Sequence, residues 1–160
     1  MLTDVNLVQS VYERFEKAVA GIPGLDPLEH DDRVTHRTAY QTILRYDPAE
    51  FAGVPRDHVL RALHAEGVPC YGRFYVPLTE DPLFAPDAAT NPVARTEWPY
   101  GGAEFPVAAR AAYEEAIWLP HELFLGSESD VDDLAAAFEK VAAAASALRD
   151  QPPSGAGPSR

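Results

Sequence analysis

The sequence has little of several residue types, and each shortage excludes a class of structure. Its single cysteine, Cys70, excludes an intramolecular disulfide and a zinc site built from several cysteines, and it suits a reducing cytoplasm. Lysine occurs only at Lys17 and Lys140. No apolar run approaches the roughly 20 residues that span a bilayer, and Met1 leads into polar helical sequence. We therefore expect neither a membrane span nor a signal peptide.

Positive charge is also scarce, with 13 basic against 25 acidic side chains and a net charge of -12. A surface of this sign argues against nucleic-acid binding through phosphate contacts and against binding to an anionic membrane. The 160 residues, 46% of them hydrophobic, suffice for one domain with a real core. We expect that domain over residues 1–150, followed by a disordered tail over 151–160 that is rich in Pro, Gly and Ser.

Hydrophobic spacing predicts helices and strands in the first half of the chain. Apolar residues at helical spacing predict a helix over 4–20, and Asp4 is available as its cap. β-Branched and aromatic residues predict a strand over 38–46. A proline at the first turn and a glycine after the end predict a helix over 55–66. An extended segment over 68–78 follows.

In the second half, a long proline-containing loop over 79–104 precedes a short helix over 105–116 and a brief strand over 117–119. A last helix begins near Ser127 or Ser129, which supply hydroxyls before a run of aspartates. One apolar stripe marks its buried side: Val131, Leu134, Phe138, Val141, Ala145 and Leu148. These elements predict an α+β fold in which helices cover a small antiparallel sheet.

Local motifs do not identify a self-sufficient catalytic site. The stretch "HDDRVTH" admits two interpretations, a metal cluster of His30, Asp31, Asp32 and His36 or a solvated loop before a strand. Its spacing does not match the helical pattern of known zinc motifs. The chain has no GxSxG nucleophile elbow, no glycine-rich phosphate loop and no Cys–His pair. Trp118 is expected to pack under the last helix.

Three stretches, in this order, resemble the C-terminal domain of the DegT/StrS sugar aminotransferases, which are pyridoxal-phosphate enzymes of fold type I. They are "YERFEKAVAGIPGL", "AYQTILRYDPAEFAGVPRDHVLRALHAEGVPCYGRFYVPL" and "FPVAARAAYEEAIWLPHELFLGSESDVDDLAAAFEKV". The "WLPH…FLG" form is most similar to the branch that aminates cyclitol ketones and antibiotic precursors. The resemblance covers about residues 5–148 and implies the small domain of a fold-type I enzyme.

The resemblance also implies where the cofactor is held. In the family, a large N-terminal domain supplies the Schiff-base lysine, an acidic partner for the pyridine nitrogen and the phosphate donors. Lys17 and Lys140 fit the polar faces of helices, and neither is expected to be desolvated as a reactive lysine must be. We therefore expect pyridoxal phosphate to bind only through a partner large domain, and we expect no transaminase activity from this chain alone. The expected protein partner is a large-domain aminotransferase chain or further copies of this chain in a homo-oligomer.

Carried onto this sequence, the family's substrate groove implies five residues that contact a small-molecule substrate: Tyr40, Tyr71, Arg73, Tyr75 and His121. Each tyrosine also fits a packing role, and His121 also fits a loop cap. The first functional hypothesis is the small-domain part of an enzyme that moves an amino group from an amino acid such as Glu or Gln to a keto-sugar or cyclitol ketone. The alternative is a non-catalytic binding or interaction module derived from that domain.

Overall fold

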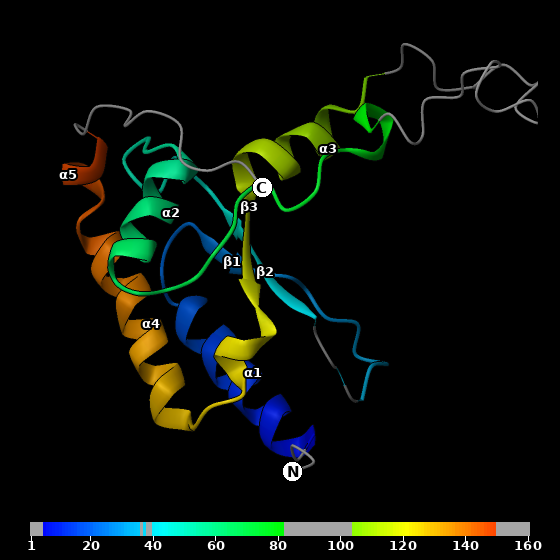
Figure 1. Ribbon diagram of the computed structural model, residues 1–160, viewed down its shortest axis with the longest axis vertical. Helices are drawn as coiled ribbons and strands as arrows, with labels where there is room; N and C mark the ends of the chain where they lie inside the picture. Colours follow the sequence, from blue (N-terminus) through cyan, green and yellow to red (C-terminus); the bar gives the residue numbers. More distant parts are fainter. Residues whose placement is uncertain (1–4, 36, 38–39, 82–103, 150–160) are drawn as a thin grey trace, which may run out of the picture.

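The computed structural model describes residues 5–35, 37, 40–81 and 104–149 (Figure 1). Its helices and strands follow one another along the chain as α1 (Val5–Val19), β1 (Leu25–Pro27), β2 (Gln41–Tyr46), α2 (Arg56–Ala65), η1 (Leu78–Glu80), α3 (Pro106–Arg110), η3 (Ala111–Glu115), β3 (Ala116–Pro120), η4 (His121–Phe124), α4 (Glu128–Ala143) and α5 (Ala145–Arg149). Of the short helices, η1 and η4 are 3₁₀-helices and η3 is a π-helix. No helix in these ranges is long and apolar enough to cross a membrane.

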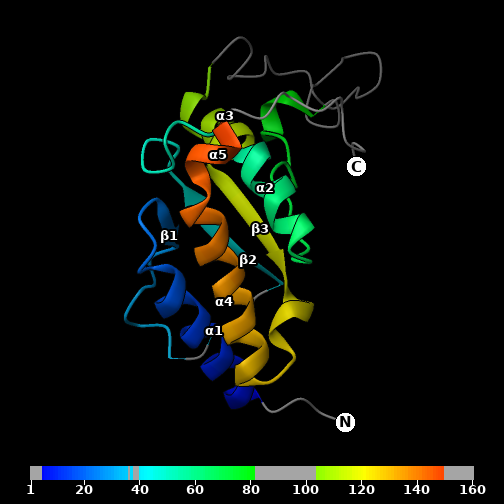
Figure 2. The ribbon, with the colours of Figure 1, turned by 90° about the vertical axis from the view of Figure 1, so that its left-hand side faces the viewer.

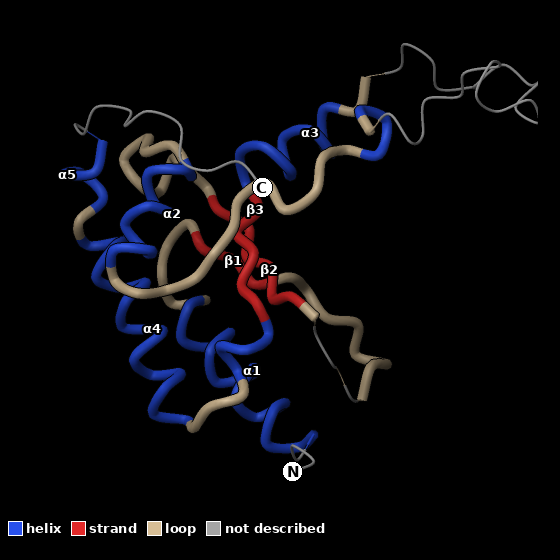
Figure 3. Tube along the Cα trace, in the orientation of Figure 1, coloured by secondary structure: helices blue, strands red, loops and turns tan. Residues whose placement is uncertain are grey.

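The three strands form one antiparallel sheet in the order β1-β2-β3, drawn in red in Figure 3. Ile43 of β2 lies opposite Trp118 of β3, and Leu44 lies opposite Ile117. The short edge strand β1 pairs only with the second half of β2, where Leu25 lies opposite Tyr46. The predicted fold class, a small antiparallel sheet with helices packed on it, is confirmed.

Helices α1, α2 and α4 lie on one side of the sheet, as Figure 2 shows. Strand residues alternate between the two faces, so every second residue of β2 and β3 meets the helices. These residues are Leu44, Tyr46, Ile117 and Leu119, and none is more than 1% exposed. The predicted stripe of the last helix is buried against them and against α1, which contributes Val11, Phe15 and Val19 to the same core.

The start of the last helix is set by Ser127. Its side chain accepts a hydrogen bond from the backbone N–H of Asp130, and the Asp130 carboxylate accepts one from the backbone N–H of Ser127 at 2.7 Å. This capping box satisfies two N–H groups that the first turn leaves unpaired. The Asp130 carboxylate accepts hydrogen bonds from both the backbone N–H and the hydroxyl of Ser127, and these hold the pKa of Asp130 below its usual value. Ser127, and not Ser129, is therefore the N-cap of α4.

Several boundaries differ from the prediction. The strand β1 was not expected, and the last helix is interrupted at Ala144 rather than continuous to residue 149. Gly24, at φ +84°, makes the turn into β1, and a Cβ there would lie 2.8 Å from Glu50. The predicted tail over 151–160 and most of the loop over 79–104 lie outside the described residues.

Candidate functional site

The face of the sheet opposite the helices carries the candidate site. Because side chains alternate along β3, Trp118 points away from the core that its neighbours Ile117 and Leu119 enter. The prediction that Trp118 packs under the last helix is therefore wrong. Its half-buried indole is covered by residues that come between α2 and η1 in the sequence.

Four aromatic residues gather on this side: Tyr71, Phe74, Tyr75 and Trp118, which we call the aromatic face. The Phe74 ring stacks on Trp118 at 5.4 Å between centroids and 23° between planes, and the Tyr75 ring meets Trp118 edge-on at 5.8 Å. Tyr71 joins through its backbone, exchanging two hydrogen bonds with Trp118 of 2.9 and 2.7 Å. Tyr71 and Tyr75 stay 47% and 61% exposed, so their side chains are accessible to a ligand.

Arg73 continues this surface toward the helix before β3. Its guanidinium carbon lies 5.0 Å from the ring centroid of Tyr113, the distance of a cation–π contact. The Tyr113 hydroxyl donates a hydrogen bond to the Glu80 carboxylate. That hydrogen bond, together with partial desolvation, raises the pKa of Tyr113, and Arg73 opposes the shift. A cation, an aromatic ring and an anion thus lie side by side at the edge of the aromatic face.

Tyr40 and His121 form a second group, at the end of the sheet where β2 begins and β3 ends. Their rings lie 6.2 Å apart, and Tyr40 is 70% exposed. Nδ1 of His121 lies 3.2 Å from a carboxylate oxygen of Glu122. The structure therefore brings the five predicted groove residues into two groups, Tyr71, Arg73 and Tyr75 around Trp118 and the Tyr40–His121 pair beyond it. Their role in substrate binding remains a prediction.

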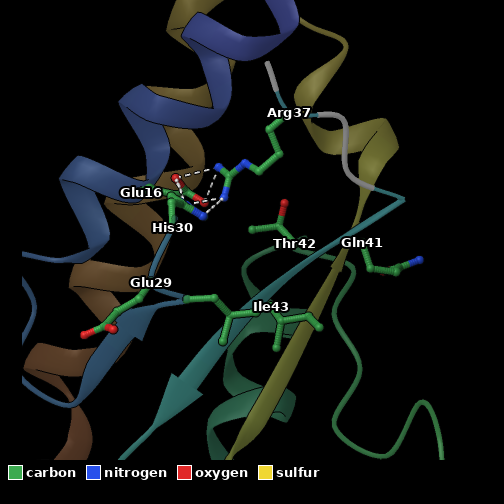
Figure 4. A pocket seen from close by; sticks show the side chains of 8 residues that line it. Glu16, Glu29, His30, Arg37, Gln41, Thr42 and Ile43 are labelled. Atoms are coloured by element: carbon green, nitrogen blue, oxygen red, sulfur yellow. Dashed lines mark hydrogen bonds and ion pairs between the residues drawn. The ribbon is translucent and has the colours of Figure 1, made fainter. Parts of the chain in front are cut away.

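A separate polar hollow of about 220 Å³ lies between α1 and β2 (Figure 4). It exists because β1 is short, so that the chain after β1 turns away from the first half of β2. Nη2 of Arg37 donates to both carboxylate oxygens of Glu16 at 2.7 Å, and Nε2 of His30 lies 3.1 Å from the same carboxylate. Figure 4 shows these three side chains pointing toward one another. The contacts of the Glu16 carboxylate thus tie His30 and Arg37 to α1.

The "HDDRVTH" stretch forms no metal cluster among the residues that the structure describes. His30 contacts Glu16, and Asp31 accepts hydrogen bonds from the backbone and side chain of Arg33. These hydrogen bonds lower the pKa of Asp31. His36, the last member of the proposed cluster, lies outside the described residues.

The two lysines and the single cysteine all lie in the part of the chain that the structure describes. Lys17 is exposed on α1, and Nζ of Lys140 pairs with Glu66 at 2.6 Å while its side chain stays 69% exposed. Both lysine side chains are therefore open to solvent on the outer sides of their helices. Burial raises the pKa of the Cys70 thiol to about 12, which leaves it protonated and unreactive.

Sequence reasoning missed the role of four residues at this site: Phe74, Trp118, Tyr113 and Glu80. The alternation in "IWL" was a usable signal, because a tryptophan between two buried aliphatic residues of a strand must face the other side. The contact of Tyr113 with Arg73 and Glu80 joins segments more than 30 residues apart in the sequence, and spacing carries no signal for it.

No protein-family model matches the sequence. Curated proteins named as L-glutamine:3-amino-2,3-dideoxy-scyllo-inosose aminotransferases are similar to it over most of its length. The protein from Streptoalloteichus tenebrarius is 42% identical over 147 residues, which cover 88% of this chain and 35% of that protein. The protein from Streptomyces kanamyceticus is 40% identical over 131 residues, which cover 77% and 31%. The chain therefore spans about a third of the length of the curated relatives that it matches.

Solved structures share the fold at lower identity. A 3-amino-5-hydroxybenzoic acid synthase superposes with a TM-score of 0.63 at 18% identity, covering 87% of this chain and 34% of that one. An aminotransferase from Streptoalloteichus hindustanus superposes with a TM-score of 0.58 at 22% identity, covering 88% and 32%. The resemblance to the sugar aminotransferases that the sequence indicated is confirmed by these findings.

Proposed function

From the resemblance to about one third of a sugar aminotransferase, we propose that this chain is the small-domain part of a pyridoxal-phosphate-dependent enzyme that aminates a keto-sugar or cyclitol ketone. The observation that carries the proposal is the 42% identity over 88% of the chain. The names of the relatives specify L-glutamine as the amino donor and inosose-type ketones as acceptors. We extend both substrate classes to this chain.

In the proposed enzyme, a large domain outside this sequence supplies the lysine that binds the cofactor. The positions of Lys17 and Lys140 support this division, because both ammonium groups are solvated on the outer sides of helices. The small domain contributes one wall of the substrate groove. If no cofactor-binding partner is found in the tests below, the chain is instead a non-catalytic binding module.

The aromatic face is the proposed groove wall. Hydroxyls of Tyr71 and Tyr75 and the guanidinium of Arg73 suit a polyol or the carboxylate of an amino-acid donor. Stacked aromatic rings also offer a flat apolar surface for the C–H face of a cyclitol ring. Tyr40 and His121 extend the proposed wall at the other end of β3.

Exposed apolar side chains next to the aromatic face are the proposed docking surface of the large domain. Leu78 of η1 and Val107 of α3 are 66% and 68% exposed. The helices that carry them lie close together, since Tyr113 of the helix that continues α3 contacts Glu80 of η1 (Figure 1). Exposed apolar side chains on neighbouring helices are typical of protein interfaces.

A complementation experiment tests the proposal. The purified chain is mixed with pyridoxal phosphate and with the part of the Streptoalloteichus tenebrarius relative that it does not match, which makes up the other two thirds of that protein. We expect a complex by size-exclusion chromatography with light scattering and L-glutamine-dependent amination of an inosose by mass spectrometry. A chain that neither binds this partner nor supports amination would argue for the non-catalytic module.

Variants then assign the roles within the complex. Lys17→Arg and Lys140→Arg are expected to keep full activity, because the cofactor lysine belongs to the partner; loss of activity in either contradicts the division of labour. Tyr75→Phe and Arg73→Gln are expected to raise KM for the ketone or the donor. Arg61→Gln, a change on the exposed surface of α2, is the matched control.

A location in the cytoplasm is also part of the proposal. Its support is the single cysteine, which is buried and free. Fractionation of the producing cells with an antibody against the chain would test it, and recovery from the culture medium would contradict it.

A further inference from the structure

Arg56, the first residue of α2, is a charged side chain enclosed in the interior. Only 4% of its side chain is exposed. A guanidinium cannot lose its proton, so burial requires that its N–H groups find acceptors. Nη1 donates to the backbone carbonyls of Ala112 at 3.0 Å and Ala116 at 3.3 Å, and Nη2 lies 3.1 Å from a carboxylate oxygen of Asp57.

The two carbonyls explain why the charge is tolerated here. They belong to the C-terminal end of the continuous helix formed by α3 and η3 and to the first residue of β3. The last carbonyls of a helix lack partners within the helix and carry the negative end of its dipole. Arg56 therefore caps the junction between this helix and β3, although it lies on a different helix.

On its other side the guanidinium lies against the backbone of Gly72. A Cβ at this position would lie 2.6 Å from Cζ, Nε and Nη2 of Arg56, closer than real Cβ atoms approach other atoms. Only glycine allows the two groups to approach this closely. The arginine cannot swing away freely, because its hydrogen bonds to Ala112 and Ala116 hold it in place.

Gly72 stands in the middle of the segment that carries the aromatic face. Tyr71 before it is hydrogen-bonded to the backbone of Trp118, and Arg73 after it lies on the Tyr113 ring. The segment is thus held at three consecutive residues, by β3, by Arg56 and by η3. Of these three contacts, the one with Arg56 is the most deeply buried.

We propose that Arg56 is a positioning residue of the aromatic face, whose buried guanidinium, packed on Gly72 and hydrogen-bonded to the end of the α3–η3 helix, sets where the segment 71–75 lies on Trp118. The proposal deepens the proposed function, since it names what places Tyr71, Arg73 and Tyr75 in the groove wall. Arg56 itself touches no substrate. It acts through the backbone of Gly72.

Trp118 provides a readout that needs neither a partner nor a ligand. The chain has two tryptophans, so the change Trp98→Phe, outside the described residues, leaves Trp118 as the only indole. Its emission maximum and its quenching by acrylamide then report how well Phe74 and Tyr75 cover it. In this background we compare Gly72→Ala, Arg56→Met and the double variant.

If Arg56 positions the segment through Gly72, Gly72→Ala shifts the Trp118 emission to longer wavelength and increases quenching. Arg56→Met removes the guanidinium that the new methyl group meets, so Gly72→Ala is expected to have little further effect in that background. Such non-additivity is the signature of two groups in direct contact. Equal effects of Gly72→Ala in both backgrounds would overturn the proposal.

Two further variants keep the test decisive. Val141→Ala weakens the core under α4, on the helix-covered face of the sheet, and is expected to lower Tm without changing the quenching of Trp118. An equal rise in quenching would show general loosening and overturn the proposal. If Arg56→Met does not fold, Arg56→Lys replaces it, because lysine keeps the charge but loses the flat fork that packs on Gly72. The complementation experiment could fail while Gly72→Ala and Arg56→Met still act non-additively on the quenching of Trp118. That result would reject the proposed function and leave the positioning role of Arg56 standing.

Discussion

The two faces of the sheet differ in burial although their residues alternate along the same strands. Ile117 and Leu119 are completely buried against the helices, while Trp118 between them stays half-exposed beneath Phe74 and Tyr75. The helix-covered core packs aliphatic side chains with the buried rings of Phe15, Phe124 and Phe138, whereas the aromatic side chains of the opposite face stay partly exposed. We therefore expect the helix-covered face to supply most of the stability of the domain.

The sharpest test of this difference compares one phenylalanine from each side. Phe138 of α4 is 1% exposed and packs edge-on against Phe15 at 5.7 Å, so Phe138→Ala is expected to lower the free energy of unfolding by about 3–5 kcal/mol. Phe74→Ala removes a ring that is only partly buried and is expected to cost less than half as much. Urea unfolding measures both. Equal losses would mean that the aromatic face is a second core.

A second test uses the same substitution on neighbouring strands. Ile117→Thr places a hydroxyl in the fully buried core and is expected to cost about 2–3 kcal/mol. Ile43→Thr, on the open face of β2, keeps a β-branched residue in the strand and is expected to cost less than about 1 kcal/mol. Thermal unfolding followed by circular dichroism separates the two. A larger loss for Ile43→Thr would reverse the assignment of the faces.

The helix-covered face could be predicted from the sequence because its signal is local. The spacing of the apolar residues in α1, α2 and α4 gave the buried stripes, and the α+β class followed from the order of elements. The strand β1 was missed because three residues ending in Pro27 are too few to show alternation. The break at Ala144 was missed because an alanine-rich stretch has no residue that ends a helix.

The open face could be predicted only in part, because its contacts are long-range. Tyr71, Arg73 and Tyr75 came from the resemblance to a family, and the structure places them around Trp118. The burial of Arg56 depends on carbonyl groups 56 and 60 residues away, which no local pattern encodes. The sequence therefore places Arg56 only within the first turn of the helix predicted over 55–66, although the structure encloses it between two elements of the site.

Substitutions at the ends of the helices should lower the stability of the domain less than substitutions in its buried core. Ser127→Ala removes the cap of α4 and is expected to lower stability by about 1 kcal/mol, as cap losses do. Ser129→Ala, in the exposed first turn of the same helix, is the matched control and is expected to change stability by less than about 0.5 kcal/mol. Urea unfolding of both variants checks the assignment. A larger loss of stability in Ser129→Ala would show that Ser129, and not Ser127, is the N-cap.

The smallest effect is expected from the ion pair that links α1 to α4 at the surface. Nε and Nη2 of Arg14 donate to the two carboxylate oxygens of Asp132 at 2.6 and 2.7 Å, and this contact lowers the pKa of Asp132. Since the folded pKa lies below the unfolded value of about 3.9, the contribution is complete above that pH and disappears as the pH falls through the folded pKa. Both side chains are about half exposed, so solvent screens the attraction.

The pH dependence of stability tests this contact. When the pH falls from neutral to acid, the free energy of unfolding should decrease slightly less in Asp132→Asn than in the unmodified chain. The reason is that the asparagine side chain has no carboxylate to protonate. Asp133→Asn, on the exposed side of the same turn, is the control, and NMR titration of the Asp132 carboxyl measures the folded pKa directly. An ordinary pKa for Asp132, or acid sensitivity unchanged in Asp132→Asn, would show that the two helices are joined by their apolar residues alone.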